Sequence, residues 1–196
     1  LRTSSAASDV YKRQHLPGAS FVPPNTPLRT ALTELATKRA LEITSLGKNF
    51  TPAYKILDEK AFVNGIVGLM ATGGSTNLVL HLPAMAKAAG IKLELSDFDD
   101  ISGVTPLMAK IYPNGLADVN HFHAAGGLSY MIAQLLESGY LHNDVQTIMG
   151  AGLETYTKEP KLVDDGIEFV SSSTKSHNEK ISVSYTHLTL PTTYEV

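Results

Sequence analysis

Two stretches of this sequence hold residues that could do chemistry, and the first is GGSTN at positions 73–77. The first N–H groups of a helix have no backbone partner and lie at the positive end of its dipole, so they favour a phosphate or carboxylate. Gly73 and Gly74 would let a ligand approach the backbone, and further bonds could come from Ser75, Thr76 and Asn77. Helix capping alone also explains Ser75 or Thr76, so both interpretations stay open. The run is not a P-loop, because no Lys-Ser/Thr pair follows the glycines.

The second stretch is DVNHFHAAGG, which contains two histidines two residues apart. His121 and His123 would share a face on a strand and would diverge on a helix. Metal ligation is one interpretation, but no third ligand is evident. Hydrogen bonding to a polyhydroxylated substrate, or a proton relay, is another. Simple capping of the next helix by Asp118 explains the same polar residues without any ligand.

The composition of the chain indicates a globular protein and excludes several classes of function. Hydrophobic residues make up 43% and charged residues 18% of the 196 positions, as in folded proteins. The net charge of −3 provides no basic surplus for nucleic acid or an anionic membrane. There is no cysteine, so these residues can form no disulfide and no thiolate metal site. No apolar run approaches the roughly 18 residues of a membrane span and no signal peptide is evident, so we expect a cytoplasmic location.

The two ends of the chain differ from its interior. Residues 1–14 show neither helical nor strand periodicity, and residues 183–196 are rich in threonine and β-branched side chains. Both ends resemble translated adapter or vector sequence, so we expect non-native tails there, with genuine frayed ends as the alternative. Between them the character of the sequence shifts near residue 155. This shift predicts one domain over residues 15–155 and the start of a second over residues 156–182.

Helix signals dominate the interior. Thr26 and Pro27 are typical of an N-cap and a first helical position, and Gly47 suits the end of that helix. Its predicted apolar face consists of Leu28, Leu32, Leu35, Ile43 and Leu46. Pro83 predicts a kink in the helix after GGSTN, with His81 beside it as a buried core histidine. Further helices are expected over residues 51–57, 60–73, 75–89, 119–138 and 143–149.

Two segments indicate strands. IKLEL at residues 91–95 alternates apolar and polar side chains, which predicts a strand. A serine cap at Ser96 would then begin a short helix or turn. KLVDDGIEFV at residues 161–170 has Asp-Gly between two apolar runs and predicts a β-hairpin. The elements together predict a helix-rich α/β fold.

Several of these segments together resemble one enzyme family. HLPGASFVPPNTPLR (15–29), LMATGGSTNLVLHLPAMAKAAGI (69–91) and ADVNHFHAAGGLSYMI (117–132) are similar to blocks of the dihydroxy-acid and phosphogluconate dehydratases. The resemblance extends over about residues 15–162. The GGSTN block is shared across this superfamily. The segments HLPGASFV (15–22) with NTPLR (25–29), DVNHFHAAGG (118–127) and TYTKEPKL (155–162) resemble its phosphogluconate branch.

The resemblance implies a hydro-lyase that removes water from 6-phospho-D-gluconate to give 2-dehydro-3-deoxy-6-phosphogluconate in the Entner–Doudoroff route. It also implies an iron–sulfur cluster, of the 4Fe–4S type, as the Lewis acid at the leaving hydroxyl, and a base for the C2 proton. A divalent metal is left open as a further cofactor. The implied fold is the later part of a three-layer α/β N-terminal domain followed by the start of a β-rich C-terminal domain, in a homodimer.

The chain departs from the family where the chemistry is concentrated. An iron–sulfur cluster needs thiolates, and this chain has none. The family motif that supplies the base region lies beyond Ser182, so we expect an internal fragment without activity of its own. The matching motifs imply substrate-binding roles, and these roles fall on Gly74, Ser75, Thr76, Asn77, His121 and His123.

Two other interpretations remain at this point. The first is a dihydroxy-acid or other sugar-acid dehydratase of the same family. The second is a cluster-free module that binds phosphate or sugar at the helix start near Gly73. In each case we expect the partner to be a small molecule, here a sugar-acid phosphate, and neither nucleic acid nor a membrane.

Overall fold

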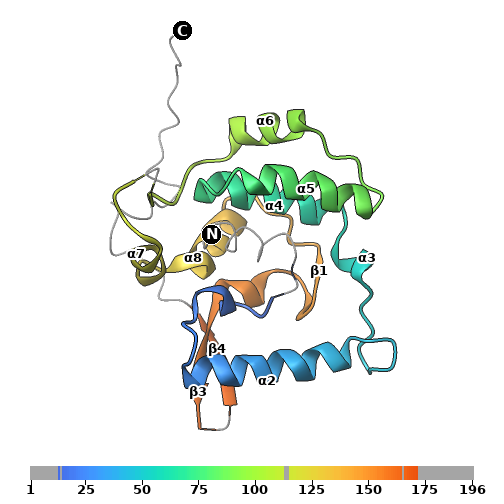
Figure 1. Ribbon diagram of the computed structural model, residues 1–196, viewed down its shortest axis with the longest axis vertical. Helices are drawn as coiled ribbons and strands as arrows, with labels where there is room; N and C mark the ends of the chain where they lie inside the picture. The colour runs from blue at the N-terminus through green and yellow to red at the C-terminus, as the bar shows by residue number, and fades with distance from the viewer. Residues whose placement is uncertain (1–12, 14, 113–114, 165, 172–196) are drawn as a thin grey trace.

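The computed structural model of this 196-residue chain describes residues 13, 15–112, 115–164 and 166–171. Within these ranges it contains seven α-helices and two short antiparallel sheets (Figure 1). The predicted helix-rich α/β character is therefore confirmed. No helix in the described ranges has the length and apolar content needed to cross a membrane.

The first elements are the 3-10 turn η1 (Ala19–Phe21) and the helix α2 (Pro27–Glu42). As predicted, Thr26 caps α2, and its hydroxyl accepts a hydrogen bond from the Arg29 N–H at 3.3 Å. Leu32 is buried, and the side chains packed around it include Leu28, Leu35 and Ile43. The prediction was wrong for Leu46, which is 98% exposed, and for the stop at Gly47. The helix ends earlier because residues 43–51 fold into turns that return bonds to Glu42 and Ile43.

The short helix α3 (Ala53–Ile56) leads into α4 (Glu59–Thr72), and α5 (Asn77–Ala88) follows. These confirm the helices predicted over residues 51–57, 60–73 and 75–89. Figure 1 shows α4, α5 and α6 stacked at one end of the molecule. Pro83 lies inside α5, and His81 is exposed rather than buried, so the prediction of a core histidine was wrong. The buried side chains of this end are Phe62, Ile66, Leu69, Leu78, Leu82, Ala86 and Phe98.

The strand predicted at residues 91–95 is not formed. Residues 91–94 belong to no helix or strand in the described part of the chain, and α6 (Leu95–Val104) begins immediately after them. Ile91 and Leu93 alternate because they pack on the α4–α5 core while the chain enters the helix. The cap is Glu94 rather than Ser96, and its N–H donates to the Asp97 carboxylate at 2.7 Å.

The helix predicted over residues 119–138 is divided into α7 (Val119–Ala124) and α8 (Gly127–Glu137). Gly126, with φ of 112°, separates them in a conformation that residues with a side chain rarely adopt.

The prediction of a helix over residues 143–149 was wrong. A small hairpin of β1 (Gln146–Thr147) and β2 (Gly150–Ala151) replaces it. The Thr147 hydroxyl donates to the Gly150 carbonyl and accepts from the Met149 N–H, and such local bonds compete with a helix.

After the 3-10 turn η2 (Glu154–Thr157), strands β3 (Lys158–Val163) and β4 (Gly166–Ser171) form the predicted hairpin. The last pair of this register joins Val163 and Gly166. The hairpin lies beside α2 in Figure 1. This contact connects the first and last described parts of the chain.

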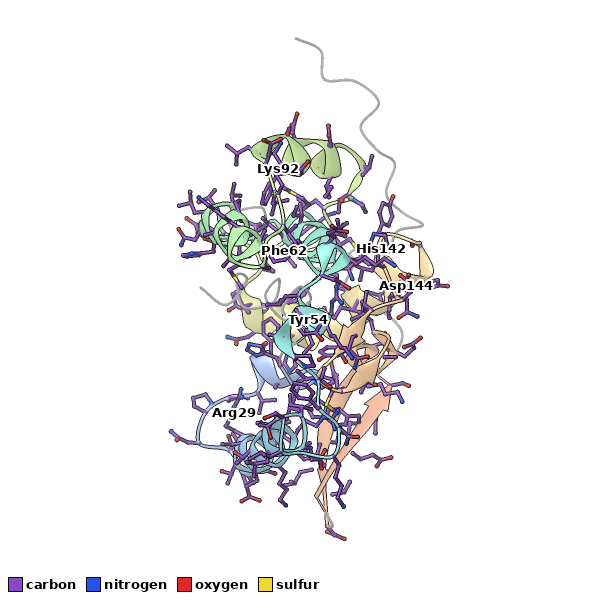
Figure 2. All side chains as sticks on the ribbon, turned by 90° about the vertical axis from the view of Figure 1, so that its right-hand side faces the viewer. Arg29, Tyr54, Phe62, Lys92, His142 and Asp144 are labelled. Carbon is purple, nitrogen blue, oxygen red and sulfur yellow. The ribbon has the colours of Figure 1, made fainter. Side chains whose placement is uncertain are left out.

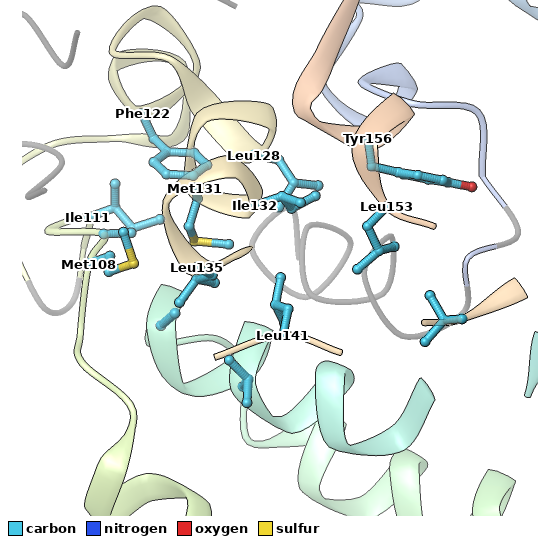
Figure 3. Close-up of a cluster of buried hydrophobic side chains, with 14 residues drawn as sticks. Met108, Ile111, Phe122, Leu128, Met131, Ile132, Leu135, Leu141, Leu153 and Tyr156 are labelled. Atoms are coloured by element: carbon cyan, nitrogen blue, oxygen red, sulfur yellow. The ribbon is translucent and has the colours of Figure 1, made fainter. Parts of the chain in front are cut away.

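Helix α8 occupies the largest core cluster (Figure 3). Its side chains contact α7, the loop after α6, and the segment that follows α8. The buried members are Val67, Ala71, Met108, Ala109, Ile111, Phe122, Leu128, Met131, Ile132, Leu135, Leu141, Val145, Leu153 and Tyr156.

The predicted tails lie outside the described residues except for Arg13. Its side chain is fully buried, and its guanidinium donates to Asp58 at 3.1 Å. The Arg13 carbonyl also accepts bonds from the Ile148 N–H and the Tyr156 hydroxyl. The assignment of tails and the domain boundaries stay predictions.

Candidate functional site

A cavity of about 240 Å³, called here the His123 cavity, lies between the segment before α2, the α7–α8 junction and β3. It is lined by Gly18, Phe21, Val22, Pro23, Thr26, Leu28, His123, Leu128, Ser129, Glu159 and Pro160. All of them except Pro23, Leu128 and Ser129 come from the segments whose sequences resemble the phosphogluconate branch. Residues more than 130 positions apart in the sequence therefore line the same cavity.

Two aromatic contacts hold the cavity together. The Phe21 ring stacks on the His123 imidazole, with centroids 5.6 Å apart and planes 12° from parallel. The Phe21 ring also packs edge-on against the Phe122 ring, with centroids 5.8 Å apart and planes at 62° to each other. Because Phe122 is buried in the main core, Phe21 fixes the imidazole of His123 relative to that core.

Two glycines allow the walls to approach one another. Gly18 has φ of 65°, and a Cβ atom at this position would lie 2.5 Å from Cδ of Pro160. Gly127 has φ of 56°, and a Cβ there would lie 3.2 Å from Nδ1 of His123. The glycine pair after DVNHFHAA is thus explained by backbone conformation and by the position of the histidine.

The polar groups of the cavity divide into two kinds. The hydroxyls are occupied, since Thr26 donates to the Pro23 carbonyl and Ser129 donates to the Lys158 carbonyl, each at 3.0 Å. The side chains of His123 and Glu159 have no hydrogen-bond partner in the described part of the chain. An imidazole and a carboxylate can together donate to and accept from the hydroxyls of a ligand.

His121 lies on the same helix but does not line the cavity. The Asp118 N–H donates to Nδ1 of His121 at 3.3 Å, and the Asp118 carboxylate accepts from the N–H groups of Asn120 and His121. Both side chains are more than half exposed. The structure therefore assigns His121 to helix capping and places only His123 at the cavity, because residues two apart diverge on a helix.

The capping role predicts a pH dependence at Asp118. The N–H of His121, donating to this carboxylate, lowers the pKa of Asp118 below its ordinary value. Its contribution to α7 is therefore present above the unfolded-state pKa, near 4, and is lost as the pH falls through the lowered value. Amide chemical shifts of Asn120 and His121 followed by NMR should show this step. It should be absent in Asp118→Asn, and an unchanged step there would contradict the assignment.

The GGSTN run lies between α4 and α5. Gly73, with φ of 56°, ends α4, and the N–H of Gly74 returns to the Leu69 carbonyl at 3.0 Å. A Cβ at Gly74 would lie 2.8 Å from the side chain of Leu69. Helix termination thus explains both glycines.

The polar half of GGSTN begins α5. The Ser75 hydroxyl accepts from the Asn77 N–H at 3.2 Å, and carbonyls of Ser75 and Thr76 accept from the next two N–H groups. Thr76 and Asn77 are exposed. Ser75 therefore satisfies one of the first N–H groups of α5, as one of the two interpretations expected, whereas Thr76, the N-cap residue, makes no side-chain cap bond in the described part of the chain. No hydrogen bond or ion pair within the described residues joins this run to His121 or His123, and the substrate-binding role stays a prediction.

Of the residues that line the His123 cavity, only His123 was predicted from the sequence as a site residue, and Phe21 and Glu159 are among those missed. Phe21 lies in an apolar stretch of the sequence and Glu159 in a charged one. Neither residue belongs to a motif whose residue types or spacing indicate a functional site. The available signal was their position inside the segments that resemble the phosphogluconate branch. In the part of the chain that the structure describes, no three His, Cys, Asp or Glu residues form a group able to hold a metal ion.

The family described as dihydroxy-acid/6-phosphogluconate dehydratase N-terminal matches residues 14–156. Since the match covers more than half of the 196 residues, the chain belongs to this family. The predicted resemblance is therefore confirmed.

Individual relatives point to one branch of the family. The chain is 61% identical to the phosphogluconate dehydratase of Rhizobium meliloti over 152 residues, which are 78% of this chain and 25% of the relative. It is 54% identical to the phosphogluconate dehydratase of Pseudomonas aeruginosa over 167 residues, 85% of the chain and 28% of the relative. The dihydroxy-acid dehydratase of Nitratidesulfovibrio vulgaris is 39% identical over 138 residues, 70% of the chain and 24% of the relative. The chain thus spans about a quarter of the length of these relatives.

Proposed function

We propose that this chain is part of a hydro-lyase that dehydrates 6-phospho-D-gluconate to 2-dehydro-3-deoxy-6-phospho-D-gluconate. The observation that carries the proposal is the difference in identity between the two branches. Identity is 61% with a phosphogluconate dehydratase and 39% with a dihydroxy-acid dehydratase. The convergence of the three branch-like segments on the His123 cavity supports the same choice.

The chain's own contribution is binding and orientation of the substrate. His123, held by its stack on Phe21, and Glu159 on β3 present a donor and acceptors to a polyhydroxylated ligand. Such hydrogen bonds position a substrate and favour it over an analogue that lacks the hydroxyls. The cavity volume of about 240 Å³ is enough for several carbon and oxygen atoms of such a ligand, although it is smaller than most complete ligand pockets.

The iron–sulfur cluster implied by the family does not fit the residues of this chain. The 196 residues include no cysteine, and the described ones include no other ligand group. The proposal therefore assigns the cluster ligands, any divalent metal site and the base to residues outside this chain. A homodimer in the cytoplasm completes the proposal for the whole protein.

The test is a chimera in which residues 15–162 of this chain, which include Glu159 and Pro160 of the cavity, replace the matching segment of the Rhizobium meliloti phosphogluconate dehydratase. We expect the chimera to dehydrate 6-phosphogluconate within about tenfold of the parent rate, a difference of about 1.4 kcal/mol in activation free energy. Cluster absorbance and oligomeric state verify that the chimera has assembled. An assembled chimera that acts on 2,3-dihydroxy acids and not on 6-phosphogluconate would overturn the proposal.

Two histidine variants of the chimera test the site itself. His123→Ala is expected to lower kcat/KM by about tenfold or more, because the hydrogen bond and the ring stack are both lost. His121→Ala is the matched control, since His121 caps α7 without lining the cavity, and its kcat/KM should stay within about twofold. Equal losses in the two variants would argue against a role of the cavity.

A further inference from the structure

A second cavity, of about 310 Å³, lies on the other side of the segment 15–23 and is called here the arginine cavity. It is lined by His15, Leu16, Ala19, Arg29, Leu32, Thr33, Ala36, Arg39, Ala40, Ile43 and Ile148. Most of these residues belong to α2. The segment 15–23 thus contributes a wall to both cavities, with Ala19 on this side and Phe21 on the other.

The charge of this lining has one sign. Arg29 and Arg39 both line the cavity, and none of the lining residues is acidic. Arg39 forms an ion pair with Glu42 at 2.8 Å. Arg29, which is half-buried, has no carboxylate within ion-pair distance among the described residues. A partly desolvated guanidinium without a counter-ion is a favourable partner for an anion.

The two guanidinium groups are held in place by backbone carbonyls. Nη2 of Arg29 donates to the carbonyls of Ala19 and Val22, and Nε of Arg39 donates to the Ile148 carbonyl. Figure 2 shows Arg29 between α2 and the segment before it. The Nε and Nη1 groups of Arg29 have no hydrogen-bond partner in the described part of the chain. The carbonyl contacts therefore orient the arginine without using all of its donors.

We propose that the arginine cavity binds a phosphate group. Guanidinium donors in a fixed fork match the oxygens of a phosphate, and a site oriented before binding loses little side-chain entropy. The cavity is larger than a bare phosphate needs, which suits a phosphate ester that continues into solvent or toward the segment 15–23. That the ester is the 6-phosphate of the sugar acid rests on the proposed function. The site itself rests on the arginines.

The test is calorimetric titration of the 196-residue chain with inorganic phosphate, 6-phosphogluconate and gluconate. Saturable binding is expected for the two phosphates and not for gluconate. Ala36→Glu places a carboxylate in the lining and should weaken phosphate binding by about tenfold or more. Thr37→Glu is the matched control, because it adds the same charge at the next position of α2, which is exposed like Ala36 but lies outside the lining, and it should change binding by less than about twofold.

Far-UV circular dichroism verifies that both variants retain their helices. The same pair in the chimera provides a second measurement, since Ala36→Glu should raise KM for 6-phosphogluconate while Thr37→Glu should not. Non-saturable phosphate binding, equal binding of gluconate, or equal affinities of the two variants overturn the phosphate site. A chimera that dehydrates 6-phosphogluconate with the same KM in both variants would overturn it while leaving the proposed function in place.

Discussion

Replacing Gly18 with alanine is expected to lower the free energy of unfolding by about 3 kcal/mol, the sum of backbone strain and overpacking. The strain arises because φ at Gly18 is 65°, where a residue with a Cβ costs about 1 kcal/mol. The overpacking arises because the new methyl group would lie 2.5 Å from Cδ of Pro160, on a ring that cannot rotate away. Urea denaturation of the wild-type chain and the variant measures the change.

Gly90→Ala is the matched control for this prediction. Gly90 also has a positive φ, of 77°, but a Cβ there would have no atom within 4 Å. It should therefore cost only the strain, about 1 kcal/mol. Since Gly18 and Pro160 both line the His123 cavity, Gly18→Ala should also displace its walls, which NMR shifts of His123 would report. Equal losses of stability in the two variants would show that the contact with Pro160 is not tight.

Local signals in the sequence predicted local structure well. Thr26 and Pro27 predicted the start of α2, and Asp118 predicted the start of α7, because a cap satisfies N–H groups within three residues of itself. The hairpin of β3 and β4 followed from two apolar runs around a short polar turn. Each of these features depends on neighbours in the chain.

Predictions failed where a local signal competed with packing. Residues 91–95 alternate like a strand, but no other strand lies beside them in the described part of the chain, and Ile91 and Leu93 pack on helices instead. Leu46 fits the period of α2, but the helix ends four residues before it. Periodicity predicts which residues could share a face, and tertiary contacts decide whether that face exists.

The candidate site shows the same limit more strongly. The sequence identified the histidine pair. Only the structure of α7 showed that His121 caps the helix while His123 lines the cavity. The partners of His123 could not be predicted, because Phe21 lies 102 positions earlier in the sequence. Resemblance to a family grouped the three segments, and only the fold placed them around one cavity.

Replacing Asp58 with alanine is the second change with a large expected effect, a loss of about 3 kcal/mol in the free energy of unfolding. One Asp58 oxygen accepts from the Ala61 N–H at 2.8 Å, as the cap of α4, and from the Arg13 guanidinium at 3.1 Å. Loss of the cap costs about 1 kcal/mol. The unpaired charge of buried Arg13 adds about 2 kcal/mol, less than the roughly 3–5 kcal/mol of a fully buried pair, because the Asp58 side chain is 39% exposed.

The Arg13→Met variant separates these two contributions. Burial lowers the pKa of Arg13 more than the nearby Asp58 raises it, and Nε of Arg13 is buried with no hydrogen-bond partner among the described residues. Methionine has similar length and no charge to desolvate, so Arg13→Met should change the free energy of unfolding by less than about 1 kcal/mol. In that background Asp58→Ala should cost only the cap, about 1 kcal/mol.

Chemical denaturation of the four chains of this double-mutant cycle gives a coupling of about 2 kcal/mol between Arg13 and Asp58. An Asp58→Ala cost that is the same in both backgrounds would show that the ion pair adds nothing to stability. The cycle also bears on the predicted tail of residues 1–14. A coupling of the expected size requires Arg13 to occupy its buried position in solution, because an exposed arginine at the end of the chain would contribute far less.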